Sequence, residues 1–293
     1  MLNRYDPSVD WLNQDMENTA IYSFIDLDRY PINDLAGVAG QRLVEESRTA
    51  LDQDGSCTMP GFVHQSTVAE MAAEVSTLQH LAYPGPTEVT PYFFNYDLDG
   101  GADVADDHPL KCKGKRKLSQ VAADLIPSHL MLSRLYYSTV LTDFLAAILE
   151  QSVYRSQDRY QSLNISMMNA GGCQQWHFDS GPMVTTLLLQ APEAGGIFEY
   201  VPELRSDDSE NFEQVQQVLD GDSNRVKRLK LEAGTLSLFR GHYSMHRVTE
   251  VEGSRTRFQA ILGFSTTPGL QGNLKSSILH YGPRVTRIEN REH

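Results

Sequence analysis

Residues 174–200 read QQWHFDSGPMVTTLLLQAPEAGGIFEY and join a polar motif to a run of predicted strands. The apolar segments VTTLLLQ and GIFEY are short and are separated by Pro and Gly, which is typical of β-strands. His177 and Asp179 lie two residues apart where this run begins. Because successive strand side chains alternate between faces, His177 and Asp179 should project from one face and Phe178 from the other.

The second half of the chain repeats this strand signal, in SLNISMMNA, VTTLLLQA, GIFEYVP, GTLSLFRG and RFQAILGFST. Before residue 160, apolar side chains are instead spaced as on helices, over 34–51, 66–83 and 133–151. Helices followed by antiparallel strands predict an α+β fold: a β-sandwich or jelly roll with flanking helices, mainly N-terminal. We predict one domain over 1–293, with helical support and loops in 1–160 and the strand core in 161–293.

Two polar segments interrupt these patterns. We expect 97–117 to be a long loop, and a candidate for closing over a bound substrate. Its basic end, KCKGKRK, is balanced by the acidic half before it, which favours a solvated loop over an anion or nucleic-acid site. The second segment, 206–224, is expected to contain a short helix.

Composition excludes several classes of function. The chain has 293 residues with 40% hydrophobic residues, enough to bury a core, and a formal charge of −13, which argues against nucleic-acid and anionic-membrane partners. No apolar run approaches the length of a membrane span, and the N-terminus does not resemble a signal peptide. Three cysteines without metal or redox spacing favour a reducing, cytoplasmic location: Cys57, Cys112 and Cys173.

His177 and Asp179 supply two donors for a metal site, and the third must come from another strand. His246 begins an alternating segment within 234–264 and is the preferred candidate, with His242 as the alternative. Two imidazoles and one carboxylate on one face form the facial triad of non-haem Fe(II) oxygenases, which leaves three coordination positions open. Gln174 and Trp176 are further candidates beside the ligands, although regular alternation would turn Trp176 away.

The open positions indicate which co-substrates the site could use. A keto acid such as 2-oxoglutarate can chelate the metal through two positions, and O₂ can take the third. The far carboxylate then needs a fixed cation, and the planar fork of arginine pairs with a carboxylate through two hydrogen bonds. Arg255 and Arg257 lie on the next predicted strand; we favour Arg257 because Arg255 is nearer the turn.

The segments WHFD, TLLLQAPEAGGIFEYVP, GTLSLFRG and HRVTEVEGSRTR occur in an order that resembles the Fe(II)- and 2-oxoglutarate-dependent oxygenases of the double-stranded β-helix fold. More narrowly, the chain is similar to the group acting on free amino acids, which includes radical halogenases and hydroxylases. The similarity extends over most of the chain, through HYGPR at 280–284. The resemblance implies Fe(II) ligands at His177, Asp179 and His246, a 2-oxoglutarate carboxylate held by Arg257 or Arg255, and O₂ as the oxidant.

Asp179 separates the subgroups of this family. The halogenases replace this carboxylate with a small residue that leaves room for chloride, so its retention favours oxygen transfer. We expect hydroxylation of an unactivated C–H bond of a small molecule, a free amino acid, with succinate and CO₂ as co-products. Desaturation or oxidative cyclisation in a biosynthetic pathway is the alternative with the same cofactors. A cupin-like metal-dependent isomerase or binding protein is the alternative from another functional class. The sequence also leaves open whether the protein forms a homodimer.

Overall fold

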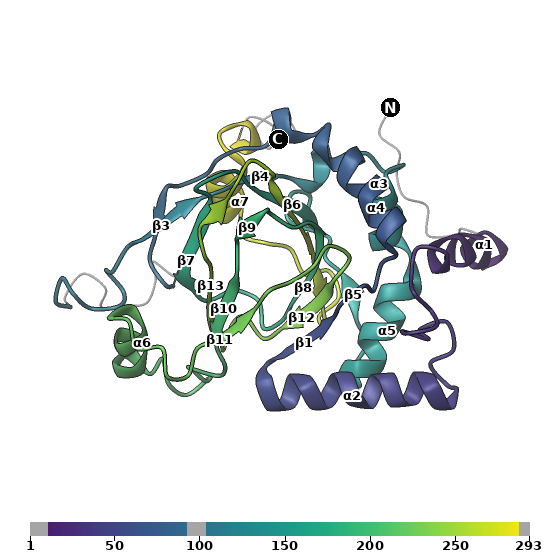
Figure 1. Ribbon diagram of the computed structural model, residues 1–293, viewed down its shortest axis with the longest axis horizontal. Coiled ribbons are helices and arrows are strands. Elements are labelled where there is room, and N and C mark those ends of the chain that lie inside the picture. The colour runs from purple at the N-terminus through teal and green to yellow at the C-terminus, as the bar shows by residue number, and fades with distance from the viewer. Residues whose placement is uncertain (1–10, 93–103, 287–293) are drawn as a thin grey trace.

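The computed structural model describes residues 11–92 and 104–286, and its main feature is a pair of six-stranded antiparallel sheets (Figure 1). The first sheet has the strand order β1 (Ser56–Met59), β12 (Leu236–Phe239), β8 (Val184–Gln190), β15 (Arg257–Leu262), β6 (Leu163–Met168), β4 (Ser119–Val121). The second has the order β11 (Lys227–Leu229), β10 (Phe198–Val201), β13 (Met245–Val248), β7 (Cys173–His177), β3 (Gly114–Lys117), β2 (Glu88–Val89). Figure 1 shows the two sheets curving around a shared interior.

Two small ribbons and the helices complete the fold. The ribbons pair β9 (Ala194–Gly195) with β14 (Val251–Glu252), and β5 (Tyr154–Arg155) with β16 (Phe264–Ser265). The helices are α1 (Trp11–Tyr22), α2 (Val38–Asp54), α3 (Gln65–Ser76), α4 (Met131–Tyr137), α5 (Thr139–Leu149), α6 (Phe212–Leu219) and α7 (Leu274–Tyr281). These elements confirm the predicted α+β class. No helix in the described ranges has both the length and the hydropathy needed to cross a membrane.

Helices α1 to α5 lie on the outer side of the first sheet, where α2 and α3 pack on its strands and α1 packs on α5 (Figure 1). Strand β15 shows how alternation builds this layer, because Phe258, Ala260 and Leu262 belong to the large apolar core under the helices. The intervening residues, Arg257 and Gln259, therefore face the space between the two sheets. The first sheet is thus apolar toward the helices and carries polar side chains toward the interior.

The predicted helices differ from the observed ones mainly at their ends. The expected helix over 133–151 is two helices, because Ser138 is extended, with φ −70° and ψ 160°, and separates α4 from α5. The helix expected over 34–51 begins only at Val38 and runs to Asp54, where Gly55 ends it in a left-handed conformation with φ 64°. The helix expected over 66–83 is α3, followed by a 3₁₀ turn at Gln79–Leu81.

The predicted division of the chain at residue 160, into a helical part and a strand part, does not hold for all strands. Strands β1 and β4 come from the first 160 residues and lie in the first sheet, and β2 and β3 lie in the second. The loop expected over 97–117 ends in strand β3, where Arg116 is buried between exposed lysines; 97–103 lies outside the described residues. The short helix expected in 206–224 is confirmed as α6.

Candidate active site

The structure brings His177, Asp179 and His246 together between the two sheets. His177 ends β7 and lies opposite His246 of β13 in the antiparallel register, and Asp179 follows β7 by two residues. One potential ligand atom from each residue lies within 4.8 Å of the other two. The two imidazole rings have centroids 4.1 Å apart, and His246 Nε2 is 3.4 Å from Asp179 Oδ2. This is the two-histidine, one-carboxylate set expected from the sequence.

The backbone fixes which nitrogen of each imidazole faces the cluster. His177 Nδ1 lies 2.8 Å from the carbonyl oxygen of Gln175, and His246 Nδ1 lies 3.0 Å from that of Ser244. Because a carbonyl oxygen only accepts hydrogen bonds, Nδ1 must carry the proton and donate in both residues. In the neutral ring, Nε2 then keeps the lone pair that a histidine needs for binding a metal ion.

The protonation states of the site also suit a metal. Burial, and then the neighbouring His246, lower the pKa of His177 to about 3, so its imidazole is neutral at pH 7. Burial opposes ionisation of Asp179, but the charge and hydrogen bond that a protonated His246 would offer outweigh it, so the pKa of this carboxyl is lowered. A neutral imidazole and an ionised carboxylate are the forms that bind a divalent cation.

A β-bulge in β7 places Gln174 beside the ligands. The pairing with β13 shifts between the His246–His177 pair and the Val248–Gln174 pair, so β7 holds one extra residue. The Gln174 amide consequently lies 2.8 Å from His177 Nε2. Trp176 is turned to the outer side, where it is buried in an apolar cluster under the Arg247 guanidinium, as alternation predicted.

Arg257 and Arg255 lie in different environments. The Arg257 side chain is buried, with a residue exposure of 4%, and burial lowers its pKa to about 10, so it stays cationic at pH 7. Within the described residues, its guanidinium makes one hydrogen bond, to Gln259 Oε1 at 2.7 Å, and no ion pair. Arg255 is exposed and donates instead to the carbonyl oxygen of Pro192 at 3.0 Å.

One polar atom close to Arg257, Nε2 of Gln259 on the same strand, has no hydrogen-bond partner among the described residues. A buried cation without an anion and buried polar groups without partners are costly unless a ligand satisfies them. Arg257 and its surroundings therefore fit the carboxylate of a bound co-substrate.

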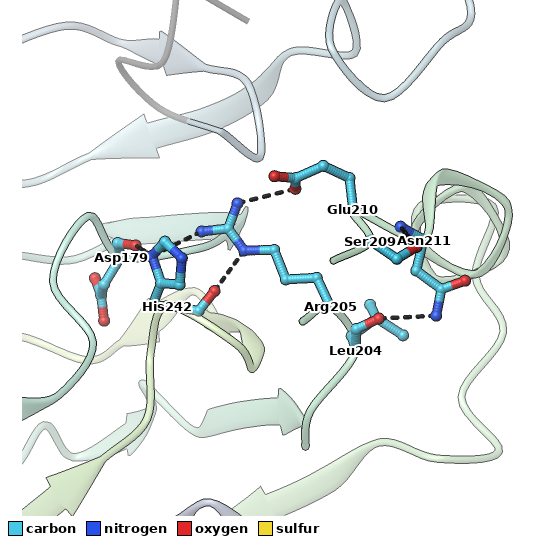
Figure 2. A network of polar contacts seen from close by, with 7 residues as sticks. All are labelled: Asp179, Leu204, Arg205, Ser209, Glu210, Asn211 and His242. Atoms are coloured by element: carbon cyan, nitrogen blue, oxygen red, sulfur yellow. Dashed lines mark hydrogen bonds and ion pairs between the residues drawn. The ribbon is translucent and has the colours of Figure 1, made fainter. Parts of the chain in front are cut away.

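His242, the alternative ligand, belongs to a separate network (Figure 2). Its Nδ1 lies 3.3 Å from the backbone oxygen of Asp179 and 3.1 Å from an Arg205 nitrogen, so it supports the ligand-bearing turn rather than joining the cluster. Arg205 also donates to the His242 carbonyl oxygen, pairs with Glu210 at 3.0 Å and stacks over the Phe178 ring at 4.3 Å. Sequence analysis missed Arg205, because nothing in a polar connecting segment marks a buried cation.

Comparison with models of known protein families shows which family the chain belongs to. The family model described as Halogenase D matches residues 102–279, which is more than half of the sequence. The chain belongs to the Halogenase D family. No curated protein sequence matches it significantly.

Solved structures share the fold of this family member. The non-haem α-ketoglutarate-dependent epimerase SnoN from nogalamycin biosynthesis matches with TM-score 0.52 and 14% identity, over 77% of this chain and 83% of its own. AviO1 from Streptomyces viridochromogenes Tue57 matches with TM-score 0.51 and 14% identity, over 78% and 97%. HygX from Streptomyces hygroscopicus matches with TM-score 0.50 and 13% identity, over 76% and 87%.

Family membership, fold and triad together confirm the resemblance to the Fe(II)- and 2-oxoglutarate-dependent oxygenases. Among these neighbours, SnoN is described as α-ketoglutarate-dependent and HygX was solved with nickel and 2-oxoglutarate, so the site of this chain is compared with a metal ion and 2-oxoglutarate. The donor set and the buried Arg257 fit this cofactor and co-substrate.

Proposed function

We propose that this enzyme hydroxylates an unactivated C–H bond of a free amino acid, with 2-oxoglutarate converted to succinate and CO₂. His177, Asp179 and His246 bind Fe(II) in this proposal, and Arg257 binds the far carboxylate of 2-oxoglutarate. The observation that carries the proposal is that two features occur together in the space between the two sheets. One is the cluster of ligand atoms within 4.8 Å, and the other is the buried Arg257 without an anionic partner among the described residues.

The bound iron, together with 2-oxoglutarate and O₂, supplies the oxidant that removes a hydrogen atom from an unactivated carbon. The protein supplies the geometry. The carbonyl oxygens of Gln175 and Ser244 hold the two imidazoles with Nε2 toward the cluster. The Arg257 guanidinium offers a planar fork for a carboxylate, and the apolar core behind its strand shields that ion pair from water.

Arg257 is proposed over Arg255 for three reasons. It is buried, its residue begins β15 on the interior face, and it has no carboxylate partner in the described parts of the chain. Arg255 lies in the turn before the strand and donates a hydrogen bond to the Pro192 carbonyl oxygen. An exposed arginine of this kind gains little from pairing with a carboxylate in water.

Asp179 favours hydroxylation over the halogenation in the family's name. Its carboxylate oxygen lies 3.4 Å from His246 Nε2, so a metal ion between these residues would have a carboxylate ligand where a chloride ion would need space. Desaturation and ring closure would need the same ligands and remain the alternatives.

A small-molecule substrate agrees with the nogalamycin RO bound to SnoN, and a 2-oxoglutarate co-substrate agrees with both SnoN and HygX. SnoN has been solved with Fe³⁺, α-ketoglutarate and nogalamycin RO, and HygX with nickel and 2-oxoglutarate. We further propose that the two sheets are the halves of a double-stranded β-helix and that the chain is a single domain. A cytoplasmic location, consistent with three free cysteines, and a homodimer stay as proposals from the sequence.

Turnover with a panel of free amino acids tests this function. Purified enzyme with Fe(II), 2-oxoglutarate, O₂ and chloride should form succinate above the substrate-free rate with one amino acid, whose product gains one oxygen atom. A chlorinated product would replace hydroxylation by halogenation, and a product lighter by two hydrogen atoms would indicate desaturation or cyclisation. If no free amino acid accelerates succinate formation, the proposed substrate class is wrong.

A further inference from the structure

Gly241 lies against the carboxylate of Asp179. It belongs to the turn between β12 and β13, and a side-chain carbon built on it would lie 1.8 Å from Asp179 Oδ2 and 2.7 Å from Asp179 Cγ. Real β-carbons do not approach other atoms so closely. Gly241 is not among the glycines with positive φ, so its backbone could accommodate alanine. Glycine is therefore needed here for space and not for a special backbone conformation.

The backbone around Gly241 is held on both sides. The Gly241 carbonyl accepts a hydrogen bond from the Asp179 N–H at 2.9 Å, and the Arg240 N–H donates to Gly55 at 2.8 Å. The next carbonyl, of His242, accepts from Arg205 (Figure 2). Because these bonds resist a shift of the turn, a side chain at 241 would have to displace the Asp179 side chain instead.

We propose that Gly241 is a positioning residue for the metal site, which keeps open the space in which the Asp179 carboxylate meets the two imidazoles. This inference rests on the proposed function, because it assumes that Asp179 is a metal ligand. The Asp179 side chain is 26% exposed, so a displaced carboxylate can turn toward solvent at little cost to the fold. The inference therefore predicts a variant that folds but binds metal poorly.

The test is Gly241→Ala, measured by titrating the metal-free protein with Ni(II) in a calorimeter. Residues that orient metal ligands typically contribute about 10- to 100-fold to metal affinity, and a loss in this range is expected. The melting temperature of the metal-free variant should stay within about 2 °C of wild type.

Gly181→Ala is the matched control. Gly181 lies in the same turn as Asp179, but an added β-carbon would meet only Met183 O, at an ordinary 3.9 Å. This variant should bind Ni(II) within about twofold of wild type, since an ordinary contact costs less than about 0.5 kcal/mol.

A double-mutant cycle shows whether the effect passes through Asp179. Asp179→Ala alone should weaken Ni(II) binding, and adding Gly241→Ala should change it by less than about twofold, because the clashing carboxylate is gone. A full further loss in the double variant would overturn the inference, as would wild-type affinity in Gly241→Ala or a metal-free variant that does not fold. If wild type itself binds no Ni(II), the proposed metal site fails first, and the two failures are thus distinguished.

Discussion

Arg257 and Arg255 are two residues apart, yet only Arg257 is buried. A hydrogen bond to a charged group contributes about 1.5–3 kcal/mol, so Arg257→Ala should raise the Kd of 2-oxoglutarate by about 10- to 150-fold. Arg257→Lys should be intermediate, because lysine cannot form the two parallel bonds. The measurement is anaerobic calorimetry on the Ni(II)-loaded enzyme. Arg255→Ala is the control, and a larger loss for it than for Arg257→Ala would reverse the assignment.

The two-residue spacing correctly predicted that His177 and Asp179 meet on one side. The pair was expected where a strand begins, but β7 ends at His177 and Asp179 lies just beyond it, in a turn held by the Gly241 carbonyl. The sequence favoured His246 but left His242 as an alternative, because His242 lies in an irregular turn whose course depends on contacts with Arg205. Gln174 could not be placed firmly beside His177, because a β-bulge cannot be recognised from one strand in isolation.

At the level of elements, Arg205 connects the segment before α6 to the turn between β12 and β13, which carries His242. Its side chain is 3% exposed, and removing it leaves the His242 carbonyl and Glu210 without their partner. Arg205→Met should lower the free energy of unfolding by about 2 kcal/mol, less than for a fully buried pair because Glu210 is partly exposed. Urea denaturation measures this. Arg42→Ala, which removes an exposed helical ion pair, should cost under about 0.5 kcal/mol, and equal losses would contradict the argument.

His280 of helix α7 lies among buried polar groups. His280 Nδ1 lies 2.6 Å from Gln120 Oε1, and burial, followed by the charge of Arg116, lowers its pKa to about 3. The unfolded chain has a histidine pKa of about 6.5 and binds a proton that the folded chain does not. This contribution to stability is therefore present above about pH 6.5 and is lost as pH falls toward 3.

The His280→Gln variant tests that effect in chelator-treated protein. Between pH 6 and pH 4, the free energy of unfolding should fall less steeply in the variant than in wild type as the pH is lowered. The two slopes should differ by about 1.4 kcal/mol per pH unit, which is the contribution of one proton. An unchanged slope for His280→Gln would show that His280 is not held neutral.

Helices were predicted best where a long apolar periodicity was followed by a recognisable stop signal. The sequence did not reveal the break at Ser138, because both helices on either side continue one apolar stripe. Strand β3 was predicted as loop because it has four residues and only Arg116 among them is buried. Its place in the sheet depends on pairing with β7, which lies far away in the sequence.

For the whole molecule, the N-terminal helices and the first sheet form one apolar core, which predicts a single unfolding transition. Phe144 of α5 is fully buried there and stacks near Phe62, with ring centroids 6.4 Å apart. Phe144→Ala should lower the free energy of unfolding by about 3–5 kcal/mol.

Two probes can follow that variant in a Trp11→Phe background. Trp176 fluorescence then reports on the second sheet, since the chain has two tryptophans, and circular dichroism reports on the helices. Phe144→Ala should shift both transitions together. Separate transitions, with only the helical signal shifted, would contradict the single domain.

The α+β class could be predicted because helix and strand patterns are local. The strands contributed by the first 160 residues could not, because β1 to β4 have only two to four residues each and are selected by their partners in the sheets. The meeting of His177 with His246 likewise depends on the register between β7 and β13, which the sequence suggests only through the order of its motifs.

The most direct test of the proposed Fe(II)–2-oxoglutarate site is anaerobic reconstitution with both ligands. We would record the visible metal-to-ligand charge-transfer band in wild type, Asp179→Ala and Arg257→Ala. The band should form in wild type, saturate only at higher 2-oxoglutarate concentration in Arg257→Ala, and weaken or vanish at matched Fe(II) in Asp179→Ala. Absence of the band in folded wild-type protein, at saturating Fe(II) and 2-oxoglutarate, would contradict the proposed site.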